Sequence, residues 1–407
     1  MSFSTQEYDI VILGGGAAGF FGALACAEKC PSAQIVILEK TRQPLAKVRV
    51  SGGGRCNTTH SCFIPAELKR RYPRGSLFLQ ALFHRFQPRD TIEWFETRGV
   101  DLKVEKDGRM FPITDSSQTI IDCFQNEAKK KGIEIRLGMD VISIQKNDSI
   151  FMLECENKEK ILAKNLLVAT GSNPKSHVLI KTLGHTIIPP VPSLFTFHIE
   201  DPRLSGLAGV TIPEVTVQCL TFKETGPLLI THWGLSGPAI LRLSAWAARE
   251  LHAVNYSAEL KIQWVAGFNQ EEMRLHLLKI KKETPSKRIM AEPLFNLPRQ
   301  LWERLLHYAG IGHEVRYSGL SRLALLKLCE TLVASKMLVK GKSIHKEEFV
   351  SCGGVNLDEV NPRTMQSLLC PGLYFAGEVL DIDGITGGFN FQNAWTTSWI
   401  AAQSMNL

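Results

Sequence analysis

The sequence predicts an α/β fold in which one ligand-binding domain is built from both ends of the chain. Two observations predict it: an apolar strand runs into a Gly-rich turn at Gly14–Gly19, and Gly-rich turns follow another strand at Gly372–Gly388. Residues that suit a helix follow each set of turns, as in the βαβ units of a parallel sheet. The region between the two differs in texture, which predicts an inserted middle domain.

The first turn has the glycine spacing of a dinucleotide-binding unit. Ile10–Leu13 has the pattern of a strand, and Gly14-x-Gly16-x-x-Gly19 stands where this strand meets a helix. In such a turn the first glycine makes the bend, the second lets a pyrophosphate approach the backbone, and the third lets the helix pack on the strand. Free N–H groups at the helix start then face the phosphates.

A carboxylate strengthens this interpretation. The next apolar run ends at Glu39, where a side chain can accept hydrogen bonds from the hydroxyls of a ribose. One alternative is an ordinary α/β turn followed by a surface glutamate. Another is a membrane helix over the uncharged residues 10–27, which is disfavoured because the run is barely long enough and has glycines near its middle. The unit alone does not distinguish FAD from NAD.

Two further segments have the character of ligand loops. Ser51–Asn57 places three glycines before Arg-Cys-Asn, so its permissive backbone can wrap a ligand, and Arg55 suits a phosphate or carboxylate. A flexible surface loop is the alternative. Further on, Glu159–Ala163 closes a predicted hairpin, and a separate strand ends in Ala169–Gly171. Small residues there let the chain pass beside a dinucleotide, although a plain strand-to-loop junction explains them equally well.

The composition changes around Pro189–Pro192, where we place a domain boundary. Residues 1–190 are therefore expected to form the first part of the ligand-binding domain, and residues 346–407 its C-terminal part. Residues 191–345 are expected to form the inserted domain. Short strand-like runs predict a strand-rich part over 191–265, and amphipathic periodicity predicts helices over 266–340.

Glycine-rich elements at four strand ends indicate one extended ligand held by both ends of the chain. The N-terminal unit would take its ADP half. The turn at Gly387–Gly388 and the helix after it would face the other half, where a flavin ring can carry negative charge at its N1–O2 edge. A nicotinamide enzyme needs only one such motif near its N-terminus. The pattern therefore predicts FAD.

The totals describe an ordinary globular chain of 407 residues, 44% hydrophobic, long enough for two or three domains. Its net charge of +7 suits anionic ligands but does not itself imply nucleic acid, and basic runs such as Lys69–Arg71 and Lys279–Arg288 are usually solvated faces. No nucleic-acid partner is therefore expected. Ten cysteines without a CxxC pair and the lack of a secretory signal predict a reduced, cytoplasmic protein without a zinc site.

Several motifs together resemble the HI0933-like flavoprotein family, also described as BaiN/RdsA-type NAD(P)/FAD-dependent oxidoreductases. They are Gly14–Gly19, Lys47-x-x-x-Ser-Gly-Gly-Gly-Arg-Cys-Asn57, Ala169–Gly171, His232-x-Gly-x-Ser-Gly-Pro238, Gly353-Gly-Val355 and Ala376–Asn390. They occur in the order of the family almost from end to end. The Ser-Gly-Gly-Gly-Arg-Cys-Asn element is the most specific of them. Two positions depart from the family: His60 stands where Asn is usual, and Cys352 where Thr or Ala is usual.

The resemblance implies a FAD domain of the glutathione-reductase class and a small β-barrel over 191–265 of the inserted domain. It implies that the ADP half is bound by Gly14, Gly16, Ala17, Ala18, Gly19, Glu39, Lys40 and Lys47. Near the adenine and the pyrophosphate it implies Val141, Ala169, Thr170 and Gly171. For the flavin half it implies Ser51, Gly52, Gly53, Gly54, Arg55, Cys56, Asn57, Gly377, Glu378, Asp383, Gly387, Gly388, Phe389 and Asn390.

The catalytic residues are not identified, and four side chains are weak candidates. The arginine before Cys56 can lower the pKa of its thiol, but disulfide oxidoreductases use a spaced pair, and Cys56 with Cys62 is not that pattern. Cys352 can face the flavin, although packing is the commoner role for both thiols. His60 and His232 are possible proton donors, whereas a lone histidine is more often a structural residue.

The leading hypothesis is a FAD-dependent oxidoreductase that moves a hydride between flavin N5 and an unsaturated or carbonyl-bearing small organic substrate. Because no second GxGxxG is present, NADH or NADPH would have to react at the flavin directly. The main alternative is a flavoprotein that binds or modifies a macromolecule such as RNA through the inserted domain. A flavin sensor without catalysis is a third possibility. We expect no membrane span, no bound metal, and a monomer or homodimer.

Overall fold

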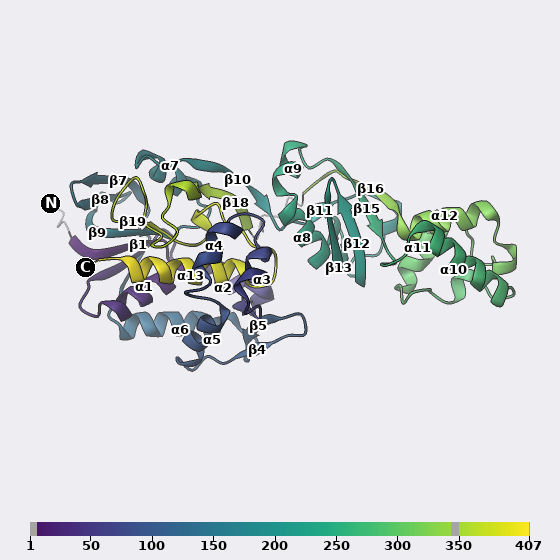
Figure 1. The fold of residues 1–407 in the computed structure, drawn as a ribbon, viewed down its shortest axis with the longest axis horizontal. Helices are drawn as coiled ribbons and strands as arrows, with labels where there is room; N and C mark the ends of the chain where they lie inside the picture. The colour runs from purple at the N-terminus through teal and green to yellow at the C-terminus, as the bar shows by residue number, and fades with distance from the viewer. Residues whose placement is uncertain (1–5, 343–349, 407) are drawn as a thin grey trace. The chain divides into compact units, whose positions relative to one another are not determined.

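The computed structural model describes residues 6–342 and 350–406. The chain divides into two compact units (Figure 1). Unit 1 contains the described residues up to Pro190 and those from Val350 onward. Unit 2 contains the residues from Val191 up to the end of the first described range. Each unit has its own sheet, and each is described separately.

A largely parallel sheet forms the centre of unit 1. Its strand order is β6-β2-β1-β9-β8-β7, and β19 pairs with the C-terminal half of β9. The strands are β1 (Gln6–Leu13), β2 (Ile35–Glu39), β6 (Glu134–Leu137), β7 (Val141–Asn147), β8 (Ile150–Cys155), β9 (Lys160–Val168) and β19 (Leu373–Phe375). Pairing is parallel from β6 through β2 and β1 to β9 and β19, and antiparallel for β7 and β8. The expected break between two strands at residues 163–165 is wrong, because β9 runs through it.

Two helices from opposite ends of the chain lie side by side on this sheet: α1 (Ala17–Lys29) and α13 (Phe389–Ser404) (Figure 1). A Cβ added at Gly22 would lie 2.7 Å from the Leu167 side chain and 3.3 Å from Ser398, so a glycine allows this close approach. Phe21 of α1 and Trp395 of α13 bring their ring centroids to 5.3 Å. The N- and C-terminal segments therefore share one core.

The remaining elements of unit 1 surround the sheet and carry its loops. They are α2 (Ala46–Gly54), β3 (Thr59–His60), α3 (Pro65–Leu68), η1 (Lys69–Arg71), α4 (Ser76–Leu82), α5 (Pro88–Glu96), β4 (Leu102–Val104), β5 (Arg109–Pro112), α6 (Ser117–Lys130), α7 (Pro174–Thr182), β18 (Val350–Val355), η5 (Leu357–Glu359) and η6 (Gly377–Val379). The strand β10 (Ile187–Ser193) begins in unit 1, and its last three residues belong to unit 2. The prolines at 189–192 lie inside β10, which pairs with β18 in a two-stranded sheet. Each strand of a two-stranded sheet is an edge strand, and an edge strand tolerates prolines, which lack an N–H.

Unit 2 is a small barrel with helices. Its strands are β11 (Phe197–His198), β12 (Thr211–Cys219), β13 (Phe222–Thr231), β14 (Gly234–Ser236), β15 (Ala258–Gln263), β16 (Ser335–Val339) and β17 (Gly341–Lys342), in the order β16-β15-β12-β13-β14-β11-β17. The two edge strands β16 and β17 are separated in the chain by Lys340 alone, whose N–H donates to the His198 carbonyl at 2.9 Å. The sheet must therefore curl until its edges meet.

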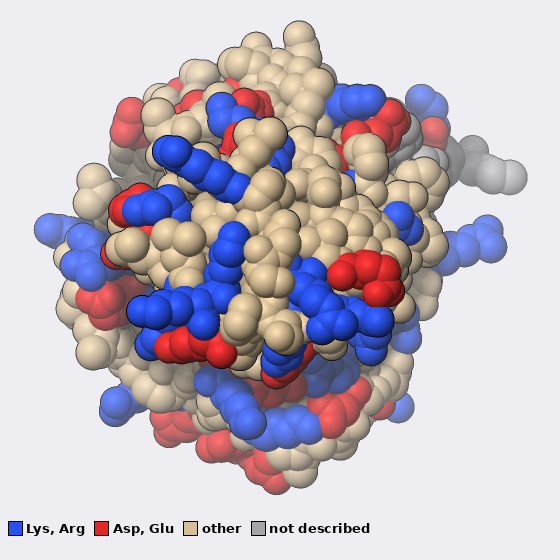
Figure 2. Space-filling model, turned by 90° about the vertical axis from the view of Figure 1, so that its right-hand side faces the viewer, with Lys and Arg blue, Asp and Glu red and all other residues tan. Residues whose placement is uncertain are grey.

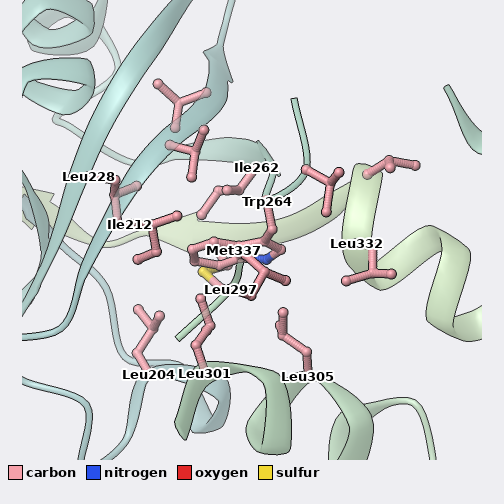
Figure 3. Packing of buried hydrophobic residues seen from close by; sticks show 14 of the residues in the cluster. Leu204, Ile212, Leu228, Ile262, Trp264, Leu297, Leu301, Leu305, Leu332 and Met337 are labelled. Carbon is pink, nitrogen blue, oxygen red and sulfur yellow. The ribbon is translucent and has the colours of Figure 1, made fainter. Parts of the chain in front are cut away.

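The helices of unit 2 are η2 (Pro202–Leu204), α8 (Pro238–Trp246), α9 (Ala248–Ala253), α10 (Gln270–Glu283), η3 (Ile289–Ala291), α11 (Arg299–Tyr308), η4 (Tyr317–Gly319) and α12 (Arg322–Val333). Figure 3 shows their apolar side chains and those of the barrel converging around Trp264 and Met337. The Trp264 indole N–H donates to Ser335 Oγ at 3.0 Å, which satisfies the polar atom of this buried ring. None of the helices within the two described ranges combines the length and the apolar character that a bilayer crossing requires.

The core of unit 2 yields a stability prediction. Leu305 on α11 is fully buried in this cluster, whereas Leu323 on α12 is 80% exposed. Leu305→Ala should lower the free energy of unfolding by about 2–5 kcal/mol, because it leaves a cavity. Leu323→Ala, the matched control, should change it by less than about 0.5 kcal/mol. Chemical denaturation of both variants measures the difference, and equal effects would contradict the packing of α11.

Candidate functional site

The site predicted from sequence lies at the carboxyl ends of the parallel strands of unit 1. The Gly14 N–H donates to the Leu38 carbonyl at 2.9 Å, which joins the ends of β1 and β2. The N–H of Ala169 donates to Leu13 at 2.9 Å, and the N–H of Ala376 donates to Val168 at 3.1 Å. Strand ends at this edge of a parallel sheet are where dinucleotides bind in such folds.

The three motif glycines have different surroundings. A Cβ at Gly14, whose φ is 112°, would lie 2.6 Å from the Ala169 carbonyl oxygen, and a Cβ at Gly19 would lie 1.9 Å from the Gly14 oxygen. These two glycines are required for packing. A Cβ at Gly16 would meet nothing within 4 Å. Open space before the first residues of α1, Ala17 and Ala18, is what a phosphate cradle needs.

Glu39 lies beside this turn. Its Oε2 accepts a hydrogen bond from the Gly15 N–H at 2.8 Å, and its Oε1 accepts from both the N–H and the hydroxyl of Thr41 at 2.8 Å. The carboxylate is thus fixed at the tip of β2. It is positioned where a ribose would lie beside the glycine turn.

A pocket next to Glu39 brings together residues from distant segments. From the predicted set it is lined by Gly14, Glu39, Lys40, Val141 and Thr170. The sequence had not indicated its other lining residues, Leu13, Leu38, Met139, Asp140, Asn173, Lys175, Ser176 and Leu179. An Asn-Pro pair at the start of α7, one residue after Ala-Thr-Gly, is the signal that could have located part of this set.

The donor set of this pocket fits a nucleotide. The Thr170 hydroxyl is buried and has no hydrogen-bond partner within the described residues. Unsatisfied buried hydroxyls are uncommon, and a ligand oxygen or nitrogen would satisfy this one. Together with the open space at Gly16, this orphaned group indicates that the ADP half of FAD fits the residues present.

Lys47 and Glu378 connect the two ends of the chain across the site. Lys47 Nζ lies 2.6 Å from Glu378 Oε2, and the other carboxylate oxygen accepts from the Ser351 N–H at 3.0 Å. The lysine side chain is 60% exposed, so the pair contributes little to stability. The pair instead positions the Glu378 carboxylate beside the carboxyl ends of the parallel strands. Gly377, with φ of 76°, is fixed by a 2.9 Å bond to Thr397 Oγ1.

The loop Ser51–Asn57 forms a nest of backbone N–H groups. Gly52, Gly53 and Gly54 have φ of 57°, 69° and 84°, and a Cβ at either of the last two would meet nothing within 4 Å. Successive N–H groups in such a turn create an anion-binding concavity. Arg55 is already paired, since it lies 2.7 Å from Glu105 and 4.0 Å above the Phe111 ring.

The Gly387–Gly388 turn packs directly on this loop. A Cβ at Gly388 would lie 2.5 Å from the Thr59 carbonyl oxygen. With its amide oriented to satisfy both neighbours, Asn57 accepts from the Gly388 N–H at 3.0 Å and donates to Thr59 at 3.1 Å. Phe389 then begins α13, whose N-terminus carries the partial positive charge expected to face the flavin.

A buried ion pair secures the segment before this turn. Arg74 Nε lies 2.5 Å from Oδ1 of Asp383, whose side chain is fully buried. Asn390 makes two 2.8 Å hydrogen bonds to the backbone of Gly384. Because Arg74 belongs to the loop before α4, nothing in its local sequence indicated this role.

The catalytic candidates fall into two groups. Cys56 and Cys352 are fully buried, and burial raises the pKa of the Cys56 thiol to about 11, which opposes a reactive thiolate. All ten cysteines are free thiols. His232 is exposed on the turn between β13 and β14 and belongs to unit 2, whereas the other three candidates belong to unit 1.

His60 is the candidate that lies against the site. Its ring stacks on Phe389 at 4.7 Å, and Nε2 lies 3.1 Å from the Asp107 carbonyl oxygen. Nε2 must donate in this contact, so in the neutral ring Nδ1 carries the lone pair. Nδ1 is buried without a partner among the described residues, and burial lowers the pKa of the ring. Its neutral form therefore prevails at pH 7.

The family is decided by comparison with known proteins. The model of the HI0933-like protein Rossmann domain matches residues 8–404. The chain belongs to this family. The family and the Rossmann-type FAD-binding fold predicted from sequence are thus confirmed, and the chain is a FAD-dependent oxidoreductase by family.

Curated relatives match over nearly their whole length. The chain is 30% identical to the ribosomal RNA dihydrouridine synthase of Escherichia coli (strain K12), with 98% of both chains covered. It is 28% identical to the protein of that name from Haemophilus influenzae, with 99% of both covered. It is also 26% identical to the 3-dehydro-bile acid delta(4,6)-reductase of Clostridium scindens, covering 97% of this chain and 98% of that one.

Solved structures share the fold at low identity. The 3-ketosteroid-delta4-(5alpha)-dehydrogenase of Rhodococcus jostii RHA1 has a TM-score of 0.51 and 12% identity, with 99% of this chain and 98% of that chain covered. The open conformation of a flavocytochrome c3 fumarate reductase has a TM-score of 0.52 and 16% identity, covering 98% of this chain and 78% of that chain. These similarities show the fold alone.

Gly16 provides a test of the cradle. Gly16→Ala adds a Cβ that meets no protein atom, in an extended backbone conformation (φ −93°, ψ −168°) that alanine adopts, so the FAD-free protein should keep its melting temperature. FAD affinity should fall about tenfold or more, because the methyl group occupies the approach of the pyrophosphate. Gly312→Ala, in equally open space in unit 2, is the control. Unchanged FAD binding by the Gly16 variant would place the pyrophosphate elsewhere.

His60 also predicts a pH dependence. Folding lowers the pKa of His60, so this ring does not destabilise the folded state at a pH above the pKa that it has in the unfolded chain. As the pH falls below that unfolded pKa, the unfolded chain takes up the proton more readily than the folded state does, and stability is lost. His60→Phe keeps an aromatic ring against Phe389 but does not titrate. The free energy of unfolding of the variant should therefore fall less than that of the wild type between about pH 7.5 and 5.5, a range around the usual histidine pKa. Parallel curves would contradict a buried, neutral ring.

Proposed function

We propose that the protein is a FAD-dependent reductase of a carbon–carbon double bond conjugated with a carbonyl group, and that its substrate is a uracil base in RNA. The reaction class is supported by the chemistry that the names of the curated relatives have in common. Dihydrouridine is uridine with two hydrogens added across C5=C6, a bond conjugated with the C4 carbonyl. A delta(4,6)-reductase of a 3-dehydro-bile acid likewise acts on double bonds that are conjugated with a ketone.

The residues of unit 1 suit this reaction. Bound FAD, once reduced by NADH or NADPH, would supply the hydride, which adds to the carbon remote from the carbonyl. The glycine turn, Glu39 and Thr170 would hold the ADP half, and the Ser51–Gly54 nest and the start of α13 would hold the flavin half. The second hydrogen arrives as a proton. Burial lowers the pKa of the His60 ring, which disfavours its protonated form as the source of this proton.

Charge favours RNA over a small molecule as the substrate. Residues 191–349 contain 20 lysines and arginines against 15 acidic residues, whereas the rest of the chain contains 27 against 25. Most of the net positive charge thus belongs to unit 2. Figure 2 views the side of the helices α10–α12, where lysine and arginine side chains form a broad band interrupted by acidic ones. Such a surface attracts a polyanion.

A small conjugated ketone is the second candidate, favoured by the bile-acid relative. The flavin site does not distinguish the two, because both present the same kind of double bond.

The reductant that we propose is NADH or NADPH, reacting at the flavin itself, since no second dinucleotide motif follows the first. We also propose a cytoplasmic location, because all ten cysteines are free thiols.

The substrate assay is a direct test. The FAD-loaded enzyme is reduced anaerobically with NADH or NADPH and then mixed with unmodified ribosomal RNA, a single-stranded oligouridylate, or a 3-oxo-4-ene steroid. Flavin reoxidation at about 450 nm and the mass of the product nucleosides are followed. We expect reoxidation by RNA together with a gain of two hydrogens on uridine. Reoxidation by the steroid alone would select the small-molecule reductase, and reoxidation by neither would overturn the reaction class.

A further inference from the structure

Unit 2 has a polar pocket that the flavin site does not use. Its volume is about 640 Å³, within the range of about 300–1,000 Å³ for small-ligand sites. Its floor is the outer face of β12, β13 and β15, where Thr216 and Gln218 alternate with the core-facing Val215 and Val217. The wall is the loop before α10 and the end of α12. The floor is therefore part of the barrel sheet.

Two lysines flank the centre of this floor. Gln218 pairs across the sheet with Lys223 on one side and with Lys261 on the other. Neighbouring strands lie about 4.8 Å apart, so the backbones of the two lysines lie about 10 Å apart on the same face. No carboxylate of the described residues forms an ion pair with either lysine. Both ammonium groups are thus available to an anion.

The other polar groups of the pocket are largely occupied within the protein. Glu272 is the acidic residue of the lining, and its carboxylate accepts from the Asn269 N–H at 2.8 Å in the capping box of α10. The Gln263 amide donates to the Phe268 carbonyl, and Thr216 shares a 2.9 Å hydroxyl contact with Thr225. The polar groups that remain are two cations with the Gln218 amide between them, and the Gln270 side chain at the start of α10. This donor set suits phosphate groups and hydroxyls rather than a cation or an apolar ligand.

We propose that this pocket binds the backbone of single-stranded RNA, with Lys223 and Lys261 on phosphates and the Gln218 amide on the sugar or base between them. This inference rests on the proposed function, which requires a polyanionic substrate. Backbone contacts of this kind provide affinity without sequence preference. An enzyme of this kind can use the binding free energy of such remote contacts to position the base that reacts. The pocket is thus an anchor for RNA on unit 2.

The test compares two double variants that remove the same charge. Lys223→Gln with Lys261→Gln alters the pocket, and Lys129→Gln with Lys131→Gln removes two exposed charges near the end of α6 in unit 1. Binding of the FAD-loaded proteins to a labelled single-stranded oligoribonucleotide is measured by fluorescence anisotropy over a KCl series. The pocket variant should bind about tenfold more weakly at about 0.1 M KCl, with a salt slope reduced by about 1.4 for two lost phosphate contacts. The control should keep the wild-type slope.

The outcomes separate the pocket from the reaction. Equal binding by the pocket variant and the control, or an absence of RNA binding by the wild type, would overturn the anchor. Steady-state reduction of a dye by NADH or NADPH should be equal in all three proteins, which shows that the flavin site is intact. If the wild type binds RNA through the pocket but forms no dihydrouridine, the anchor stands and the proposed reaction falls. If dihydrouridine forms and the pocket variant binds normally, the reaction stands and the anchor falls.

Discussion

The structure of unit 1 depends on one strand pairing, that of β19 with β9. Leu373–Phe375 pair in parallel with Leu166–Val168, which brings the C-terminal segment into the sheet that the N-terminal segment began. This pairing helps to place Glu378 and the Gly387–Gly388 turn at the same sheet edge as Gly14–Gly19. The packing of α1 on α13 through Gly22 and the hydrogen bond between Asn57 and Gly388 reinforce it. A cofactor longer than one βαβ unit can span would thereby be held between two chain ends.

Because both chain ends meet at the carboxyl ends of the parallel strands, glycines are concentrated at that edge of the sheet. Gly14 and Gly19 are needed because backbone atoms lie where their Cβ atoms would be, whereas Gly16, Gly53 and Gly54 leave space that no protein atom fills. A sequence motif does not distinguish these two reasons, since both select glycine. The structure does, because protein contacts explain the first group, whereas the second group leaves room beside the turn and the loop. We propose that Gly16, Gly53 and Gly54 border the path of FAD.

Much of this site could be predicted from sequence, because its signals are local. Gly14–Gly19 and Ser51–Asn57 are backbone motifs whose chemistry is contained in a few consecutive residues. Arg74 could not be predicted, because its partner Asp383 lies 309 positions away and only the fold brings them together. The sequence pattern predicts two strands where β9 is continuous, because the side chains of Lys164 and Asn165, at the expected break, find partners in Asp9 and in the Asn406 carbonyl. Tertiary contacts overrode the local pattern.

The charge distribution bears on how one flavin fold could serve both a nucleic acid and a small ketone. Adding a hydride to a conjugated bond requires the same flavin geometry for either substrate, so unit 1 need not differ between them. With 27 basic and 25 acidic residues outside 191–349, unit 1 also has little net field to attract a polyanion. If the substrate is RNA, as we propose, its selection would come from unit 2, where Lys223 and Lys261 stand on the barrel sheet without an ion pair among the described residues. Substrate choice could then change by substitutions on the barrel surface while the cradle for FAD stayed the same.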